Sequence, residues 1–264
     1  MEEKQLDALT QRVADLILEA ERLVVFTGAG VSTESGLPDF RSPGGIWERF
    51  DPDDFTWEKF LKNPDARRKQ WQMLNKMGLT LKAKPNAVHY AIAELQRMGR
   101  LDSVITQNID GLHQKAGSPD DRVFELHGNM QWVVCLGCGK RYPLEEIKAR
   151  LDKGEEIPDC EACQGILKPE VVFFGELLPQ RVLSEASYRS ANCDLFLVIG
   201  SSLVVYPAAH MPIYAVSGGA RLVIINLSPT PMDHRATVLI RAKAGEVMPK
   251  IIKRVKEKIY QTSG

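Results

Sequence analysis

Residues 23–30 read LVVFTGAG, a continuous apolar run that ends in a glycine-rich turn. A short run of this kind is typical of a strand buried on both faces of a parallel sheet. When a helix follows it, a Gly-x-Gly turn can bring backbone N–H groups close to a pyrophosphate. The turn alone does not decide between a dinucleotide site and an ordinary tight turn. Position 33 is not a third glycine, and no acidic ribose partner is evident at the end of a second strand.

Strand and helix patterns alternate on the C-terminal side of this turn as well. Apolar residues at helical spacing predict helices over residues 4–21, Asn86–Met98 and about 246–259. Apolar runs predict further strands at Ser103–Thr106, Val171–Phe174, Leu195–Ile199 and Leu222–Ile225. This alternation predicts an α/β fold with a Rossmann-like, mostly parallel sheet and helices on both faces.

Two stretches interrupt the alternation and predict a second, smaller lobe. Residues 41–85 are irregular and partly helical around 57–77, which indicates a helical insertion, and residues 128–168 hold four paired cysteines. We therefore expect a Rossmann-like domain made of residues 1–40, 86–127 and 169–264. The helical insertion and a zinc-ribbon module over 128–168 would form the smaller lobe.

The paired cysteines predict one zinc site. Two C-x2-C pairs, Cys135/Cys138 and Cys160/Cys163, are separated by 21 residues and can fold over one tetrahedral ion. Four thiolates leave no open coordination position, so the zinc would be structural. Cys193 stands alone and is expected to be a buried, apolar-like side chain.

Charge and hydropathy exclude several classes of protein. The 264 residues include 34 basic and 34 acidic side chains, which gives no electrostatic reason to expect nucleic-acid binding. The basic stretch at Lys250–Lys258 is interrupted at helical spacing and indicates a solvated helix face. No apolar run is long enough to span a bilayer, and no signal peptide is evident. We expect a monomeric, cytoplasmic protein without membrane contacts.

A series of motifs extends the first glycine turn. Residues 28–42 read GAGVSTESGLPDFRS, and TQNIDGLH at 106–113, LHG at 126–128, GSSL at 200–203 and NLSPT at 226–230 follow. Together with the cysteines just after the His-Gly pair, this set resembles the sirtuin family of NAD-dependent protein deacylases. The resemblance keeps the family's order from about residue 23 to 249. It implies NAD as co-substrate and one structural zinc.

The resemblance also implies which residues bind NAD. The glycine turn and the loop after it would hold the pyrophosphate and ribose, and the segment after the second strand would contact ribose and nicotinamide. Gly200, Ser201 and Ser202 match the adenosine side, Asn226 the adenine ribose, and Ala244 a backbone contact to adenine. The full set is Gly28, Ala29, Gly30, Ser32, Thr33, Asp39, Phe40, Arg41, Gln107, Asn108, Ile109, Asp110, Gly200, Ser201, Ser202, Asn226, Leu227, Ser228 and Ala244.

Three residues would carry the catalysis that the resemblance implies. His127 matches the general base, Asp110 would bind the nicotinamide carboxamide, and Asn108 would place a water or a ribose hydroxyl. Imidazole suits a base because its pKa lies near neutral pH. His89 and His113 are expected to be structural. The products would be deacylated lysine, nicotinamide and O-acyl-ADP-ribose.

The substrate would be an acyl-lysine in a protein or peptide. Val172, Phe174, Gly175 and Glu176 resemble the segment that clamps the peptide by strand addition. Relatives that remove succinyl groups carry a Tyr-x-x-Arg pair, whereas residues 70–77 here read QWQMLNKM. Met73, Leu74 and Met77 offer an apolar wall instead, which favours acetyl or longer neutral acyl groups.

Two other functions fit the same sequence. A mono-ADP-ribosyltransferase would keep the fold and NAD but transfer ADP-ribose to protein. A non-catalytic NAD-sensing module would bind NAD without releasing nicotinamide, although the presence of His127, Asn108 and Asp110 argues against lost catalysis.

Overall fold

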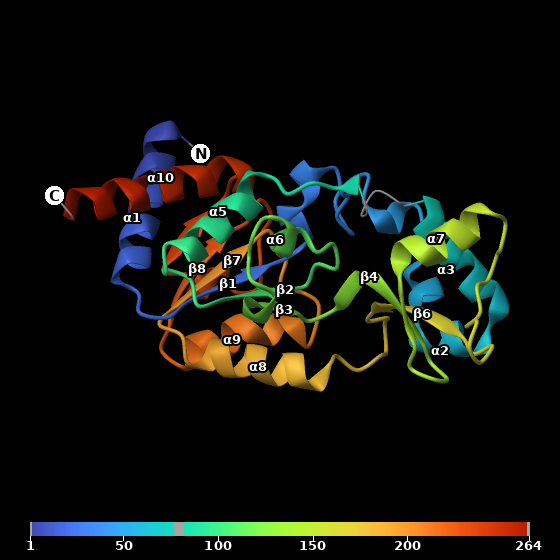
Figure 1. Cartoon of the computed structure of the whole chain (residues 1–264). Coiled ribbons are helices and arrows are strands. Elements are labelled where there is room, and N and C mark those ends of the chain that lie inside the picture. Colours follow the sequence, from blue (N-terminus) through green and yellow to red (C-terminus); the bar gives the residue numbers. More distant parts are fainter. Residues whose placement is uncertain (1, 77–81, 263–264) are drawn as a thin grey trace.

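The computed structural model describes residues 2–76 and 82–262, which form two lobes joined side by side (Figure 1). The larger lobe holds a sheet between two layers of helices, and the smaller lobe holds a separate, twisted sheet with α2, α3 and α7 beside it. Among the described residues, no helix is both long and apolar enough to cross a membrane.

The larger sheet is parallel throughout. Its strand order is β3-β2-β1-β7-β8-β9, which numbered along this sheet is 3-2-1-4-5-6, the order of a dinucleotide-binding Rossmann fold. The central strands β1, β7 and β2 are buried along their whole length, as their apolar runs predict. The strands are β1 (Leu23–Thr27), β2 (Ser103–Thr106), β3 (Val123–Glu125), β7 (Leu195–Ile199), β8 (Arg221–Ile225) and β9 (Val238–Ile240).

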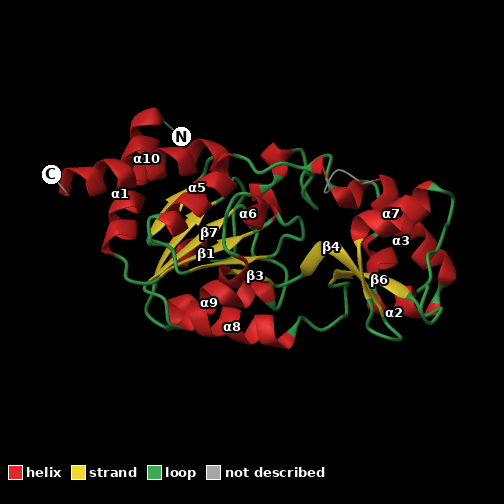
Figure 2. Cartoon of the chain, viewed as in Figure 1, coloured by secondary structure: helices red, strands yellow, loops and turns green. Residues whose placement is uncertain are grey.

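Helices cover both faces of this sheet (Figure 2). Successive side chains of a strand point to opposite faces, so Val25 packs with α1, α5 and α10 while Val24 and Phe26 pack with α8 and α9. These helices are α1 (Glu3–Glu19), α5 (Ala87–Arg97), α8 (Gln180–Ala191), α9 (Met211–Ser217) and α10 (Ala244–Thr262); a short α6 (Leu112–Lys115) follows β2.

The smaller lobe has its own core. Its antiparallel sheet has the order β5-β4-β6, and the fully buried Trp71, Tyr142 and Ile147 pack between this sheet and helices α3 and α7. The elements are β4 (Gly128–Cys135), β5 (Arg141–Pro143), β6 (Leu167–Val171), α2 (Trp57–Lys62), α3 (Pro64–Lys76) and α7 (Leu144–Asp152).

The predicted fold class is confirmed, with two corrections. The strand expected at Val171–Phe174 is instead β6 at Leu167–Val171, and it pairs with β4 of the small lobe. Phe174 then forms a bridge with Thr56, so this segment does not join the parallel sheet. The second correction concerns the glycine turn, where the α-helix of the general phosphate-binding pattern is replaced by two 3-10 turns, Ala29–Val31 and Thr33–Ser35. The boundaries between the lobes stay a prediction.

Candidate active site and metal cluster

The loops that follow β1 and β7 meet at the point where the strand order reverses. The N–H of Gly30 donates to the carbonyl of Gly200 over 2.9 Å, and a Cβ at Gly28 or Gly30 would come within 2.9 Å of that oxygen. Gly200 itself has φ +62. Glycines are required here because the two loops touch backbone to backbone. Ligands of open α/β sheets bind at this position.

A buried hydrogen-bond network connects the first loop with the residues after β2. The Ser32 hydroxyl donates to Asp110 Oδ2 over 2.7 Å and accepts from Asn108 Nδ2 over 3.2 Å. Asn108 Nδ2 also reaches the carbonyl of Gly28 at 3.1 Å, and the Leu112 N–H donates to Asp110 Oδ1. The network orients Asn108 and Asp110, both 8% exposed, without any ligand.

The His127 ring is held in one tautomer. Its Nδ1 lies 3.0 Å from the carbonyl oxygen of Gln107, and because a carbonyl can only accept, Nδ1 carries the proton. The remaining nitrogen, Nε2, therefore has the lone pair. Burial lowers the pKa of His127, and the hydrogen bond to Gln107 only partly opposes this shift. The imidazole is thus neutral and basic at Nε2 at neutral pH.

His127 lines a cavity of about 300 Å³ between the two lobes. Thirteen of the predicted cofactor, catalytic and peptide residues line the same cavity. They come from the first loop, the segment after β2, the turn between β3 and β4, and the segment after β6: Ala29, Ser32, Phe40, Arg41, Gln107, Asn108, Ile109, Asp110, His127, Val172, Phe174, Gly175 and Glu176. Residues as far apart in the chain as Ala29 and Glu176 therefore share one space.

The other predicted cofactor residues lie outside this cavity. Gly28, Gly30, Gly200 and Ser201 lie at the junction of the two loops, where Gln107 Nε2 donates to Ser201 Oγ over 2.7 Å. Asn226, Leu227 and Ser228 follow β8, and Ala244 begins α10. Thr33 and Ser202 lie farther along the same two loops. The Asp39 carboxylate accepts a hydrogen bond from the N–H of Ser42.

Several cavity residues were not predicted from the sequence. Ile46, Trp47 and Phe55 come from the insertion, and Val205, Tyr206 and Pro207 come from the loop after β7. The Tyr-Pro pair soon after a predicted strand end was the available signal. Of the predicted acyl wall, Met73 and Leu74 line the cavity with Gln70, whereas Met77 lies outside the described residues.

His89 and His113 lie behind the site and not in it. Their rings are 5.0 Å apart and fully buried, and His113 Nε2 lies 2.9 Å from the Thr27 hydroxyl. Burial lowers the pKa of His89 to about 4 and that of His113 to about 3. Cys193 is also buried, and burial raises the pKa of its thiol to about 12.

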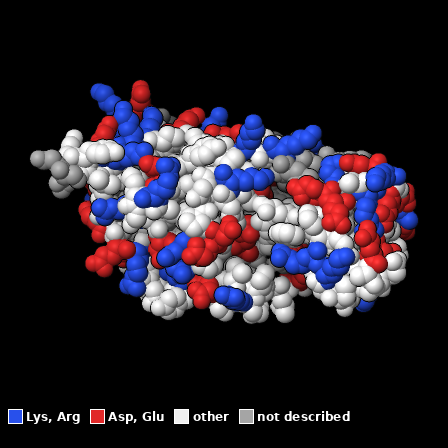
Figure 3. All heavy atoms as spheres, in the orientation of Figure 1, with Lys and Arg blue, Asp and Glu red and all other residues white. Residues whose placement is uncertain are grey.

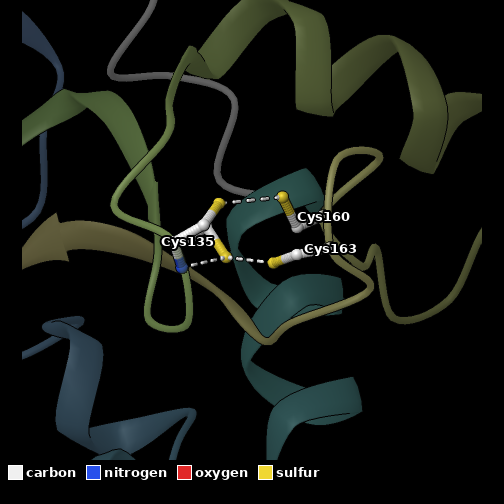
Figure 4. Close-up of side chains that lie close together, drawn as sticks. Cys135, Cys160 and Cys163 are labelled. Carbon is white, nitrogen blue, oxygen red and sulfur yellow. Dashed lines mark hydrogen bonds between the residues drawn. The ribbon is translucent and has the colours of Figure 1, made fainter.

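The four paired cysteines converge in the small lobe (Figure 4). All four Sγ atoms lie within 4.8 Å of one another, with Cys135 and Cys163 at 3.4 Å and Cys138 and Cys160 at 3.7 Å. Four sulfurs around a tetrahedral zinc lie about 3.8 Å apart, so the cluster fits that ion. The Tyr142 hydroxyl lies 3.2 Å from Cys160 Sγ, and this hydrogen bond lowers the pKa of Cys160 to about 6.

The parallel sheet, the glycine loops at its switch point, the interlobe cavity and the separate cysteine cluster define a class of protein. It is a dinucleotide-binding α/β protein with a metal-binding second lobe. Within that class, the Sir2 family model matches residues 28–207, which is more than half of the chain. The chain belongs to the Sir2 family.

Curated relatives and solved structures agree with this assignment. The chain is 48% identical to "NAD-dependent protein deacylase 2" of Archaeoglobus fulgidus, over 93% of this chain and 96% of the relative. It is 46% identical to "NAD-dependent protein deacetylase 1" of Pyrobaculum aerophilum, over 94% and 95%. A solved structure of Sir2 with a p53 peptide and NAD+ superposes with a TM-score of 0.85 at 40% identity, covering 94% of this chain and 98% of that one.

Proposed function

We propose that this protein is an NAD-dependent protein lysine deacylase that releases nicotinamide and O-acyl-ADP-ribose. One observation carries the proposal: a neutral imidazole, with its basic nitrogen fixed by Gln107, shares a cavity with Asn108 and Asp110. Two relatives, 48% and 46% identical to this chain, are named NAD-dependent protein deacylase and NAD-dependent protein deacetylase, which supports the proposal.

The residues present fit a dinucleotide. The closely packed glycine loops end at the switch point of a Rossmann-ordered sheet, where backbone N–H groups can approach a pyrophosphate. When bound, NAD supplies an electrophilic ribose carbon and a ribose hydroxyl that can be deprotonated. Asp110, already oriented by Ser32 and Leu112, would accept hydrogen bonds from the nicotinamide carboxamide.

His127 acts as the general base. With NAD bound, its Nε2 would accept the proton of a ribose hydroxyl, and the Nδ1 hydrogen bond to Gln107 would stabilise the resulting imidazolium. Asn108 holds a water or a hydroxyl beside it. Phe40, half-buried and with its ring centre 5.2 Å from that of Trp47, would shield the reacting carbon from water.

The acyl-lysine peptide binds between the segment Val172–Glu176 and the loop Val205–Pro207, which line the cavity together. Main-chain hydrogen bonds would add the peptide as a strand, which suits many different sequences. The cytoplasm fits the two cysteine pairs, which need reduced thiols to bind zinc. We further propose that the protein is a monomer, which its elution volume in size-exclusion chromatography would test.

Gln70, Met73 and Leu74 set the acyl preference. None of these three side chains is cationic, so this part of the wall offers no partner for an acyl carboxylate; among the described lining residues the one Lys or Arg is Arg41, which comes from the loop after β1. Acetyl and longer neutral acyl groups are therefore the substrates. The test compares acetyl-, butyryl- and succinyl-lysine forms of one peptide at equal concentration. Faster turnover of the succinyl form would reject this preference.

The reaction class is tested with labelled NAD, an acetyl-lysine peptide and mass spectrometry. The proposal expects nicotinamide, deacetylated peptide and O-acetyl-ADP-ribose in equal amounts. Label that stays on protein as ADP-ribose would identify a mono-ADP-ribosyltransferase. NAD binding without nicotinamide release, for every acyl peptide offered, would identify a sensing module.

A further inference from the structure

Lys168 is a buried lysine, the second residue of β6. It is 4% exposed, and burial lowers the pKa of its ammonium while Glu176 opposes the shift. A buried ammonium costs free energy unless it is paired and hydrogen-bonded. Its Nζ donates to the carbonyl of Val171 over 2.6 Å and to Glu176 Oε2 over 3.0 Å, and it lies 4.7 Å from the centre of the Phe173 ring. Phe173 and Glu176 belong to the segment that follows β6, and the Val171 carbonyl ends the strand. Nζ also donates to the carbonyl of Pro169 over 3.3 Å and lies 5.5 Å from the centre of the Trp57 ring.

Glu176 closes a turn within that segment. Its Oε2 also accepts from the N–H of Phe173 over 2.9 Å, and its own N–H donates to the carbonyl of Phe173 over 3.0 Å. Gly175, at φ +80, makes the reversal between them. The Lys168 ammonium and the Glu176 carboxylate therefore fix the shape of residues 173–176 from inside the small lobe.

The same turn forms one wall of the substrate cavity. The Phe174 N–H and carbonyl are already bonded to Phe55 and Trp57, at 3.0 and 2.9 Å, so the segment is fastened to the small lobe on that side. Val172, Phe174 and Glu176 line the cavity opposite Val205–Pro207. A displacement of the turn would thus change the width of the groove without touching the residues around Asp110 and Ser32.

We propose that the Lys168–Glu176 ion pair is a positioning device for the acyl-lysine peptide, holding residues 173–176 in the conformation that binds it. This inference rests on the proposed deacylase function. Lys168 contacts neither peptide nor NAD; it acts through the turn. The pair consequently controls peptide affinity and leaves NAD affinity alone.

The test measures separate KM values for an acetyl-lysine peptide and for NAD, with kcat. Lys168→Met keeps a long side chain but removes the positive charge. The Glu176 carboxylate then has no ion-pair partner, and the turn at residues 173–176 is no longer held in place. We expect the peptide KM to rise about tenfold, with the NAD KM within about twofold of wild type. Lys153→Met, at an exposed lysine of the same lobe, should change neither value.

Glu176→Gln provides a second variant in case Lys168→Met does not fold. The amide oxygen can still accept from Phe173, so we expect a smaller rise in peptide KM, about threefold. In the double variant, the rise in peptide KM should be smaller than the product of the two single-variant rises, because both substitutions break the same ion pair.

A folded Lys168→Met or Glu176→Gln protein with wild-type peptide KM would overturn the inference. So would a fall in kcat alone, since that is the mark of a merely structural role. A wild-type protein that turns over no acyl peptide would instead reject the proposed function, so the two failures are distinguishable.

Discussion

His127 combines burial with a single hydrogen bond, and both effects bear on its use as a base. Burial lowers its pKa below the ordinary 6.5. A base works only when deprotonated, so activity is present above this folded-state pKa and is lost as pH falls through it. We therefore expect the acid limb of a kcat/KM profile to have its midpoint below pH 6.5. A midpoint above that value would mean that the titrating base is another group.

The predicted site residues lie together in the structure where a motif carried several polar residues in a fixed order. Asn108, Asp110 and His127 follow strand ends in the sequence, and the structure gathers them because parallel strands end at one edge. Trp47 and Phe55 were missed since they lie in an irregular insertion, where an aromatic residue gives no periodic signal. The ion pair of Lys168 with Glu176 was equally hidden, because a lysine in a sequence pattern indicates exposure.

At the scale of elements, the cysteine cluster ties β4 to the loop before β6. Removing the metal with a strong chelator should break the link between β4 and the loop before β6 and should unfold the small lobe first. We expect loss of deacylation, a lower melting temperature, and recovery of both when zinc is restored.

The matched variants for this prediction are Cys163→Ser and Cys193→Ser. Cys163→Ser should lose bound zinc, measured by elemental analysis, whereas Cys193→Ser should retain it because Cys193 lies in the large lobe. Full activity of the metal-free protein would show that the cluster does not hold the lobe together.

The sequence pattern placed one strand, β6, in the wrong sheet and at the wrong residues. Val171–Phe174 is apolar and reads as a strand of the parallel sheet, yet β6 begins four residues earlier and pairs antiparallel with β4. Lys168 and Pro169 make this strand hard to recognise from the sequence. The charge of Lys168 is paired with Glu176, which lies outside the strand. Only tertiary pairing decides which sheet a short apolar run joins.

At the scale of the whole molecule, the order of strands along the chain was enough to predict the fold class. The alternation of strands and helices implies right-handed crossovers and a parallel sheet. It did not reveal the edge strands β3 and β9, which are three residues each. On the face seen in Figure 3, acidic and basic side chains are interspersed, in keeping with the balanced composition.

Acid should destabilise the whole molecule through the buried histidine pair. The folded-state pKa values of His89 and His113, about 4 and about 3, lie below the ordinary 6.5, so the unfolded chain binds more protons in that window. Stability from these groups is fully present above pH 6.5 and falls as pH drops toward 4. Each histidine contributes about 1.4 kcal/mol per pH unit.

Denaturant unfolding at pH 7 and pH 5 measures this effect. His113→Gln should lose about 2 kcal/mol less than wild type between the two pH values. His234→Gln, at an exposed histidine, should match wild type. Glu125, whose pKa burial raises to about 7, acts in the opposite direction, but it is present in all three proteins. Equal losses in His113→Gln and wild type would contradict the assignment.

The most direct test of the account is deacetylation by wild type and by His127→Ala in the presence of NAD, with the exposed His234→Ala as control. We expect wild type and the control to form O-acetyl-ADP-ribose and nicotinamide in step with deacetylated peptide. His127→Ala, which lacks the base, should deacetylate at least about 100-fold more slowly while remaining folded. A His127→Ala protein that keeps the wild-type rate would contradict the account.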